Sequence, residues 1–281
     1  MTGKVYIALA LLLALFSRTT AQERIYTPDD SVFIENIIER HSPARGCTPG
    51  EAINTIAGEF IGERYIAGTL ENQGEPLYIS RSKLDCTTFV EMVVAVYSTI
   101  KEGLRSFGEV CRNIEKVRYL NGRRDGYASR LHYISWWIDN NKNIVHEVLT
   151  EKHTAVQQLN LKFMSSNPDN YPALTGNAAR VEAIAELEKP YRGIDIKYIP
   201  KESVTLLEKT DVKEGDIIAI VTAIEGLDVS HLGFAKWHGE VLHMIHASSQ
   251  KGEVVDDMEP LADYLKKRKN HLGIRVLRVI E

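Results

Sequence analysis

A largely apolar segment at residues 86–100 constrains the fold more than any other part of this chain. It reads CTTFVEMVVAVYSTI, and its apolar side chains occupy nearly every face of a helix instead of a single stripe. A run of this length without glycine or proline favours a helix over a strand. Because such a helix has no face suited to water, other elements must surround it. We therefore predict a buried central helix.

The spacing of the apolar residues changes along the chain. Helical spacing predicts helices over residues 28–40 and 49–60, whereas the alternation of apolar and polar residues after Gly215 is typical of strands. The predicted strands are residues 216–223, 229–237, 240–248, 253–256 and 272–280, with a helix over 260–269 between the last two. Helices first and antiparallel strands after them indicate an α+β fold.

We expect one domain over residues 22–281. Residues 104–200 interrupt the pattern with helical fragments and turn-rich sequence, and we interpret them as a helical and loop insertion packed on the core. A separate small domain is the alternative. The whole chain has 34 Lys and Arg against 38 Asp and Glu, a formal net charge of -4. No overall positive field draws it to nucleic acid, which we exclude as a partner.

Residues 1–21 have the pattern of a secretory signal peptide. Lys4 precedes an apolar run at residues 5–16, and Thr19 and Ala21 supply the small residues that signal peptidase needs. The run is too short to span roughly 30 Å of hydrocarbon as a settled helix. We expect cleavage after Ala21, export to the periplasm or beyond, and no stable membrane anchor.

Cys86 lies where the buried helix should begin, with Asp85 as its expected N-cap. A thiolate at this point faces unpaired backbone N–H groups and the positive end of the helix dipole, and both lower the thiol pKa. Cys86 is therefore a candidate nucleophile. The alternative is a packed, structural cysteine.

A nucleophilic cysteine needs a base, and the histidines of the C-terminal strands supply candidates. If His238 and Gly239 form the two-residue turn of a hairpin, His231 and His246 stand opposite each other on one face. We then expect His231 to act as base and His246 to orient it. A register shifted by one residue, a structural pair and a zinc site with Cys86 are alternatives. No close-spaced ligand pair accompanies these residues, so we expect no metal or other cofactor.

Four motifs in sequence order resemble the NlpC-type cysteine hydrolases of the cell wall. They lie at residues 85–90, 215–218, 230–234 and 245–248. The resemblance implies a papain-like core, in which the nucleophile begins a buried helix packed on an antiparallel sheet. It also implies Cys86 as nucleophile, His231 as general base and His246 as the third polar member.

Two further segments, residues 64–71 and 129–133, resemble the N-acetylmuramoyl-L-alanine amidase-like branch of that superfamily. This resemblance implies an exported cysteine amidase that hydrolyses the amide between N-acetylmuramic acid and L-Ala in peptidoglycan fragments through a thioester. Most superfamily members cut inside the stem peptide, so an endopeptidase is one alternative. A non-catalytic peptidoglycan-binding module is the other, and a thiol of ordinary pKa would favour it.

The resemblance also indicates residues beside the substrate. Tyr65 is expected to approach the reaction centre, where it can hydrogen-bond the substrate or the oxyanion. Asp85 lies next to the nucleophile, and Arg130 and His132 can pair with a carboxylate or a sugar hydroxyl. A disulfide between Cys47 and Cys111 would leave Cys86 as the unpaired thiol of an exported chain.

Overall fold

The computed structural model describes residues 23–42, 47–71, 74–148 and 153–280. The expected signal peptide at residues 1–21 lies outside this part of the chain. None of the helices in the described residues combines the length and apolar character needed to cross a membrane.

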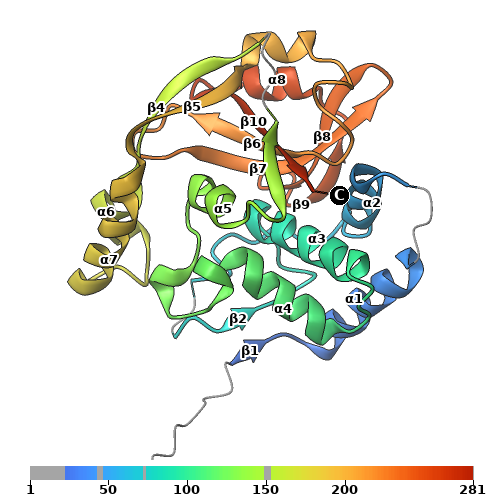
Figure 1. The fold of residues 1–281 in the computed structure, drawn as a ribbon, viewed down its shortest axis with the longest axis horizontal. Coiled ribbons are helices and arrows are strands. Elements are labelled where there is room, and N and C mark those ends of the chain that lie inside the picture. The colour runs from blue at the N-terminus through green and yellow to red at the C-terminus, as the bar shows by residue number, and fades with distance from the viewer. Residues whose placement is uncertain (1–22, 43–46, 72–73, 149–152, 281) are drawn as a thin grey trace, which may run out of the picture.

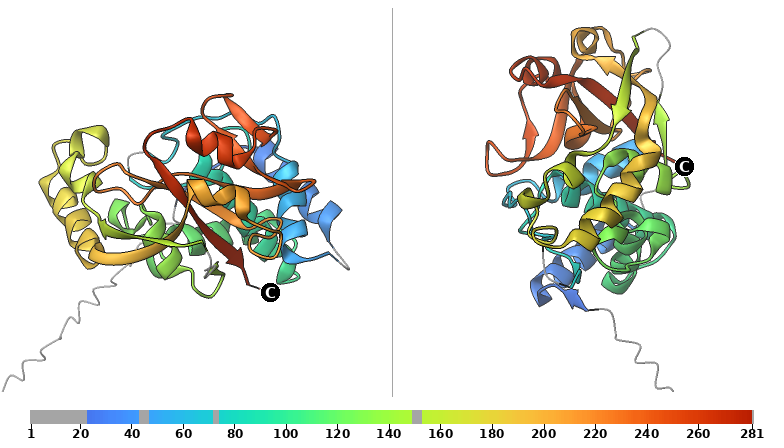
Figure 2. Two further views of the ribbon diagram at one scale, coloured as in Figure 1. Left: turned by 90° about the horizontal axis from the view of Figure 1, so that it is seen from above. Right: turned by 90° about the vertical axis from the view of Figure 1, so that its left-hand side faces the viewer.

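One antiparallel sheet and a group of helices form the two main layers of the described chain (Figure 1). The strands follow the order β4-β5-β10-β6-β7-β8-β9, and β3 also pairs with β10. Figure 2 shows the same layers from two further directions. The strand bounds are β3 Val145–Val148, β4 Ala155–Asn160, β5 Arg192–Pro200, β6 Ile217–Thr222, β7 Val229–His238, β8 Val241–Ser248, β9 Glu253–Asp257 and β10 His271–Val279. Two short strands, β1 (Arg24–Ile25) and β2 (Leu77–Tyr78), form a separate parallel pair.

Helices cover both faces of the sheet. The bounds are α1 Pro28–His41, α2 Pro49–Gly58, α3 Cys86–Lys101, α4 Phe107–Arg118, α5 Ile134–Asn140, α6 Phe163–Ser166, α7 Ala178–Glu188 and α8 Leu261–Lys266. The larger core lies between the sheet and helices α1 to α5, and a smaller core lies under α8 on the opposite face. Neighbouring residues of β6 divide between the two cores, because successive side chains of a strand point to opposite faces.

Helix α3 is the buried central helix that the sequence predicts. The ring of Phe89 on α3 meets Phe60 edge-on at 6.0 Å on one side and Phe234 of β7 at 5.6 Å on the other. These contacts hold the start of α3 against β7. The five predicted C-terminal strands all form, with bounds shifted by at most two residues. The mixed α+β architecture with an antiparallel sheet is confirmed.

The helical and loop insertion predicted at residues 104–200 also contains strands, which the prediction did not include. The segment contains α4 to α7, but it also supplies β3, β4 and β5 to the main sheet. Strand β5 pairs with both β4 and β10, so the insertion extends the sheet at one edge. Most side chains of β4 and β5 are partly or fully exposed. Such strands lack the strong apolar alternation by which a strand is found in a sequence.

The sequence left open a disulfide between Cys47 and Cys111, and the structure does not form it. Cys111 is fully buried in the core on α4, whereas Cys47 is exposed near the start of α2. The environments of the two sulfur atoms differ because one belongs to the apolar face of a helix and the other precedes a helix at the surface.

Candidate active site

Cys86 is the first residue of α3, and its neighbour Asp85 caps the helix as predicted. The Thr88 backbone N–H donates to Asp85 Oδ1 at 2.8 Å, and the Asp85 N–H donates to Thr88 Oγ1 at 2.9 Å. The Phe89 N–H donates to the Asp85 carbonyl. The N–H groups of Cys86 and Thr87 are therefore the ones that remain at this helix end for an oxyanion.

Cys86 and His231 line one cavity of about 120 Å³, together with His132. The walls come from the start of α3, from the segment that leads into α5, and from the beginning of β7. The backbone N–H of Leu232 is directed at the Cys86 sulfur, which places the thiol beside the residue that follows His231. The tertiary structure thus brings together residues separated by 145 positions in the sequence.

A chain of hydrogen bonds leads away from His231. Its Nε2 lies 2.6 Å from Nδ1 of His246, and Nε2 of His246 lies 3.2 Å from Oδ2 of Asp257. The Asp257 carboxylate only accepts, so His246 Nε2 carries a proton and its Nδ1 accepts from Nε2 of His231. In neutral His231 the remaining nitrogen, Nδ1, is then unprotonated. Asp257 therefore fixes both tautomers so that His231 presents a basic nitrogen.

Asp257 is the member of this chain that sequence reasoning missed. It is 3% exposed, and Lys251 Nζ and the Glu259 N–H donate to its other carboxylate oxygen at 2.7 and 2.9 Å. These bonds lower the pKa of Asp257 although burial alone would raise it. The carboxylate stays ionised beside His246. Only the pairing of β8 with β9, which a linear sequence does not show, could have indicated it.

The register of the β7–β8 hairpin differs from the prediction by two residues. His238 pairs with Val241 and Phe234 with Ile245, so the turn is Gly239–Glu240 and not His238–Gly239. A shift of two keeps every side chain on its face, because the strand period is two. His231 and His246 therefore still meet, as diagonal neighbours.

Two backbone features aim these histidines. Strand β7 carries a bulge at Ser230, because Ile220 of β6 pairs with His231 while the next residue, Val221, pairs with Val229. Bulges of this kind redirect side chains and occur often beside active sites. Gly233 leaves room for His246, since a Cβ on Gly233 would lie 2.9 Å from the His246 Cβ.

The thiol and the imidazoles are neutral in this environment. Burial, followed by the Asp85 carboxylate, raises the pKa of Cys86 to about 12. The direction is opposite to the one expected from the helix end, because loss of water and a neighbouring negative charge both disfavour the thiolate. Burial and the neighbouring His246, Arg268 and His271 hold the pKa of His231 well below 6.5. Burial also lowers the pKa of His246, against the opposing effect of Asp257.

Tyr65 and His132 lie where a substrate could meet them. Burial raises the pKa of the Tyr65 hydroxyl to about 12, and the Cys86 and Asp85 charges close to it add to the effect. Its phenol is therefore a neutral donor near Cys86. His132 Nε2 donates to the Tyr127 carbonyl at 2.9 Å, so its Nδ1 is an acceptor. Burial and Arg130 keep the pKa of His132 well below 6.5.

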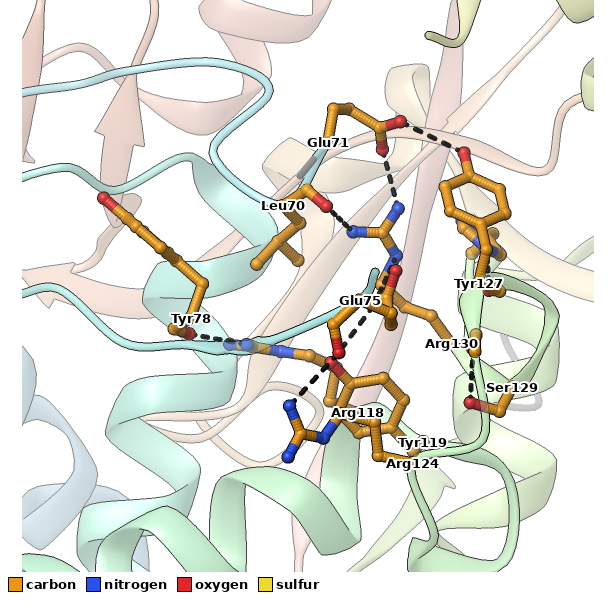
Figure 3. A network of polar contacts seen from close by, with 12 residues as sticks. Leu70, Glu71, Glu75, Tyr78, Arg118, Tyr119, Arg124, Tyr127, Ser129 and Arg130 are labelled. Atoms are coloured by element: carbon orange, nitrogen blue, oxygen red, sulfur yellow. Dashed lines mark hydrogen bonds and ion pairs between the residues drawn. The ribbon is translucent and has the colours of Figure 1, made fainter. Parts of the chain in front are cut away.

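The structure engages Arg130, predicted as a substrate contact, in bonds within the protein. Arg130 is 5% exposed and does not line the Cys86 cavity. Its guanidinium donates to the Leu70 carbonyl at 2.6 Å and to Glu71 Oε1 at 2.7 Å, and Glu75 lies 3.6 Å away (Figure 3). A sequence shows that an arginine can bind a carboxylate, but it does not show whether that carboxylate belongs to the substrate or to the protein. Here the acids belong to the loop before β2, so Arg130 holds that loop in place.

Two buried carboxylates line the Cys86 cavity but bind to the protein itself. Glu91 Oε2 accepts from Arg118 Nε at 2.6 Å, and both side chains are at most 3% exposed. Asp228 Oδ2 accepts from the Ser135 N–H at 2.7 Å. These carboxylates fix the walls of the cavity, one from α3 and one just before β7.

Comparison with known proteins agrees with this architecture. Residues 55–274 match the model of the AmiA-like family, described as N-acetylmuramoyl-L-alanine amidase-like. The chain belongs to this family. A search of curated proteins gave no match.

Solved structures of several organisms resemble this AmiA-like chain. An N-acetylmuramoyl-L-alanine amidase from Bacteroides uniformis ATCC 8492 is 36% identical, with a TM-score of 0.78 over 83% of this chain and 99% of that one. A Bacteroides fragilis protein provisionally described as a xylanase is 40% identical, with a TM-score of 0.73 over 80% and 99%. Protein LPG0564 from Legionella pneumophila, at 23% identity and a TM-score of 0.65 over 90% and 95%, shares the fold.

Proposed function

We propose that this AmiA-like protein is a cysteine amidase that hydrolyses the amide between N-acetylmuramic acid and L-Ala in peptidoglycan fragments. One observation carries the proposal: the Asp257–His246–His231 chain leaves an unprotonated Nδ1 on a histidine that shares a cavity with Cys86. A thiol, a base and a group that orients the base are the parts that cysteine-based acyl transfer requires. Family membership favours the muramoyl amide as the bond cut.

The first half of the reaction forms a thioester. His231 Nδ1 takes the Cys86 proton while the sulfur attacks the lactyl carbonyl carbon of muramic acid. The N–H groups of Cys86 and Thr87, and the neutral phenol of Tyr65, then stabilise the resulting oxyanion. The C–N bond then breaks, and the proton on His231 passes to the departing amine of L-Ala. The muramic acid stays on the enzyme as an acyl group.

The second half releases the sugar. A water molecule gives its proton to His231 and attacks the thioester, and the second oxyanion collapses with Cys86 as leaving group. The proton on His231 returns to the sulfur, which restores the neutral pair. Because thiol and imidazole are both neutral at rest, the base acts on the thiol during attack and no resting ion pair is needed.

The substrate contacts and the location of the protein extend this proposal. We assign His132 Nδ1, the phenol of Tyr65 and the carboxylate of Asp85 as polar contacts around the bound fragment. Export after cleavage at Ala21 would bring the enzyme to peptidoglycan, and rests on the sequence pattern of residues 1–21. N-terminal sequencing of protein from the producing cells tests it, since a retained Met1 would contradict the proposal.

The deciding experiment is mass spectrometry of defined muropeptides incubated with wild type and with Cys86→Ala. Release of the intact stem peptide from muramic acid, lost in the variant, is expected. Cys47→Ala is the matched control, because it removes an exposed thiol away from the cavity and should retain activity. Both monomeric and anhydro muropeptides should be included.

Other outcomes identify the rival functions. A cut inside the stem peptide, also lost in Cys86→Ala, would identify an endopeptidase with the same centre. Binding without any product would identify a non-catalytic module. Hydrolysis of xylan retained in Cys86→Ala would identify a glycosidase. Such an enzyme would need two carboxylates as acid and base, and Glu91 and Asp228 are engaged in internal bonds.

A further inference from the structure

A second cavity, of about 540 Å³, has His231 in its lining but not Cys86. Ser230 and His231 line both cavities, so His231 forms part of the wall between them. The ring of Tyr264 stacks between His231 and His271, at centroid distances of 6.1 and 5.8 Å. The second cavity therefore shares its aromatic wall with the Cys86 cavity at His231.

The lining of the second cavity is cationic. Arg268 and Lys269 contribute full positive charges, and none of the lining residues is acidic. Arg268 lies over the Tyr264 ring, 5.1 Å from its centroid. Neither cation forms an ion pair with an acidic side chain in the part of the chain that the structure describes. Unpaired cations around a pocket next to a reaction centre favour a ligand that carries a negative charge.

His271 adds an independent sign of a missing ligand. Its side chain is 5% exposed, it lines the cavity, and its Nδ1 has no hydrogen-bond partner among the described residues. A buried polar group without a partner costs free energy, so such groups are usually satisfied when a site is occupied. Burial, Arg268 and Lys201 lower the pKa of His271 to about 4, so the imidazole is a neutral hydrogen-bonding group.

The chemistry of the proposed reaction says which part of the substrate reaches this cavity. His231 gives its proton to the departing amine, so the leaving peptide lies on the His231 side of the scissile bond. The first carboxylate after that bond is the α-carboxylate of the D-glutamate that follows L-Ala in a stem peptide. Its distance from the scissile nitrogen is a few bonds, which suits a cavity that begins at His231.

We propose that the cavity lined by Arg268, Lys269 and His271 binds the first free carboxylate of the leaving stem peptide. Arg268 supplies the principal charge, and Lys269 lies beside it at the exposed rim. The inference rests on the proposed amidase function. It makes the enzyme selective for fragments whose D-glutamate carboxylate is free over fragments in which it is amidated.

The test compares two muramyl tripeptides that differ only in whether this carboxylate is free or amidated. Wild type should favour the free acid by roughly tenfold to a hundredfold in kcat/KM, the range of one charged hydrogen bond. Arg268→Gln should lose this preference by raising KM for the free acid alone, and Arg268→Lys should restore part of it. An effect of Arg268 on His231 would change kcat for both substrates equally.

Lys266→Gln is the matched control, because it removes one positive charge from α8 without altering the cavity lining. It should keep the wild-type preference. If wild type cleaves both tripeptides equally well, the carboxylate site is overturned while the amidase stands.

If wild type cleaves neither tripeptide, the amidase proposal fails and binding decides the inference. Calorimetry with Cys86→Ala and the two free peptides should then show tighter binding of the acid, lost on adding Arg268→Gln. Equal affinity for both peptides, or no binding of either, would overturn it.

Discussion

His231 Nε2 and His246 Nδ1 lie 2.6 Å apart, with their rings at 89° to each other. This hydrogen bond makes His231 a base with one fixed tautomer, because Asp257 determines the proton position on His246. Through His246, the Asp257 carboxylate determines the protonation of His231 Nδ1, although it does not contact that nitrogen. In the proposed reaction, the activation of Cys86 thus depends on three residues of the sheet.

Asp257→Asn should lower kcat by roughly 100-fold or more with little change in KM, in the range of a lost general base. An amide donates as well as accepts, so it permits the wrong tautomer of His246. Asp256→Asn is the neighbouring control, because the Asp256 carboxylate pairs with His238 instead. Steady-state kinetics on a muropeptide measures both. Equal activity of Asp257→Asn and wild type would refute the proton relay.

Gly233→Ala should reduce kcat by about tenfold or more, since the added methyl meets the His246 Cβ at 2.9 Å and the Ile245 carbonyl at 3.0 Å. The shift of His246 would break its bond to His231. Gly58→Ala is the control, because a Cβ there meets no atom within 4 Å. A fully active Gly233→Ala would show that the strand moves without disturbing the histidines.

The pH profile should reflect two neutral groups. His231 loses its basicity only when protonated, and its pKa is lowered, so activity should persist below pH 6.5 where an ordinary imidazole would be charged.

The Cys86 pKa of about 12 predicts slow alkylation by iodoacetamide at pH 7, with a rate that rises with pH as the thiolate fraction grows. Fast alkylation at pH 6 would instead indicate a thiolate–imidazolium pair at rest.

Arg130→Met should destabilise the protein by about 3–5 kcal/mol, because it leaves the Glu75 carboxylate buried without its cation. Chemical denaturation measures the free energy of unfolding. Adding Glu75→Gln to the same protein should recover part of the loss. A normal stability with a raised KM would return Arg130 to the role of substrate ligand that the sequence suggested.

Thiol titration of the denatured, non-reduced mature protein should give three reactive thiols per chain. Cys111 is buried on α4 and Cys47 is exposed near α2, and the structure joins neither to a second cysteine by a disulfide. A count of one would restore the Cys47–Cys111 disulfide expected of an exported chain.

The sequence by itself determined the local features of this protein. Helix α3 follows from a largely apolar run, its start from the N-cap residue Asp85, and β7 and β8 from their alternation. These signals are local because capping and amphipathicity involve residues a few positions apart. The sequence also predicted that His231 and His246 lie on the same face of the hairpin. That prediction held although the register was wrong by two residues, because a shift of two keeps each side chain on its face.

Tertiary structure alone decided what depends on long-range packing. Asp257 joins His246 only because β9 pairs with β8, and Arg130 meets Glu75 only because the loop before β2 folds over it. The pKa of Cys86 depends on how much water reaches the sulfur. The position of Cys86 at a helix end does not determine that. Strands β4 and β5 were missed because exposed strands at the edge of a sheet carry little apolar alternation. In each case the decisive energy term, burial or a distant charge, is a property of the assembled fold.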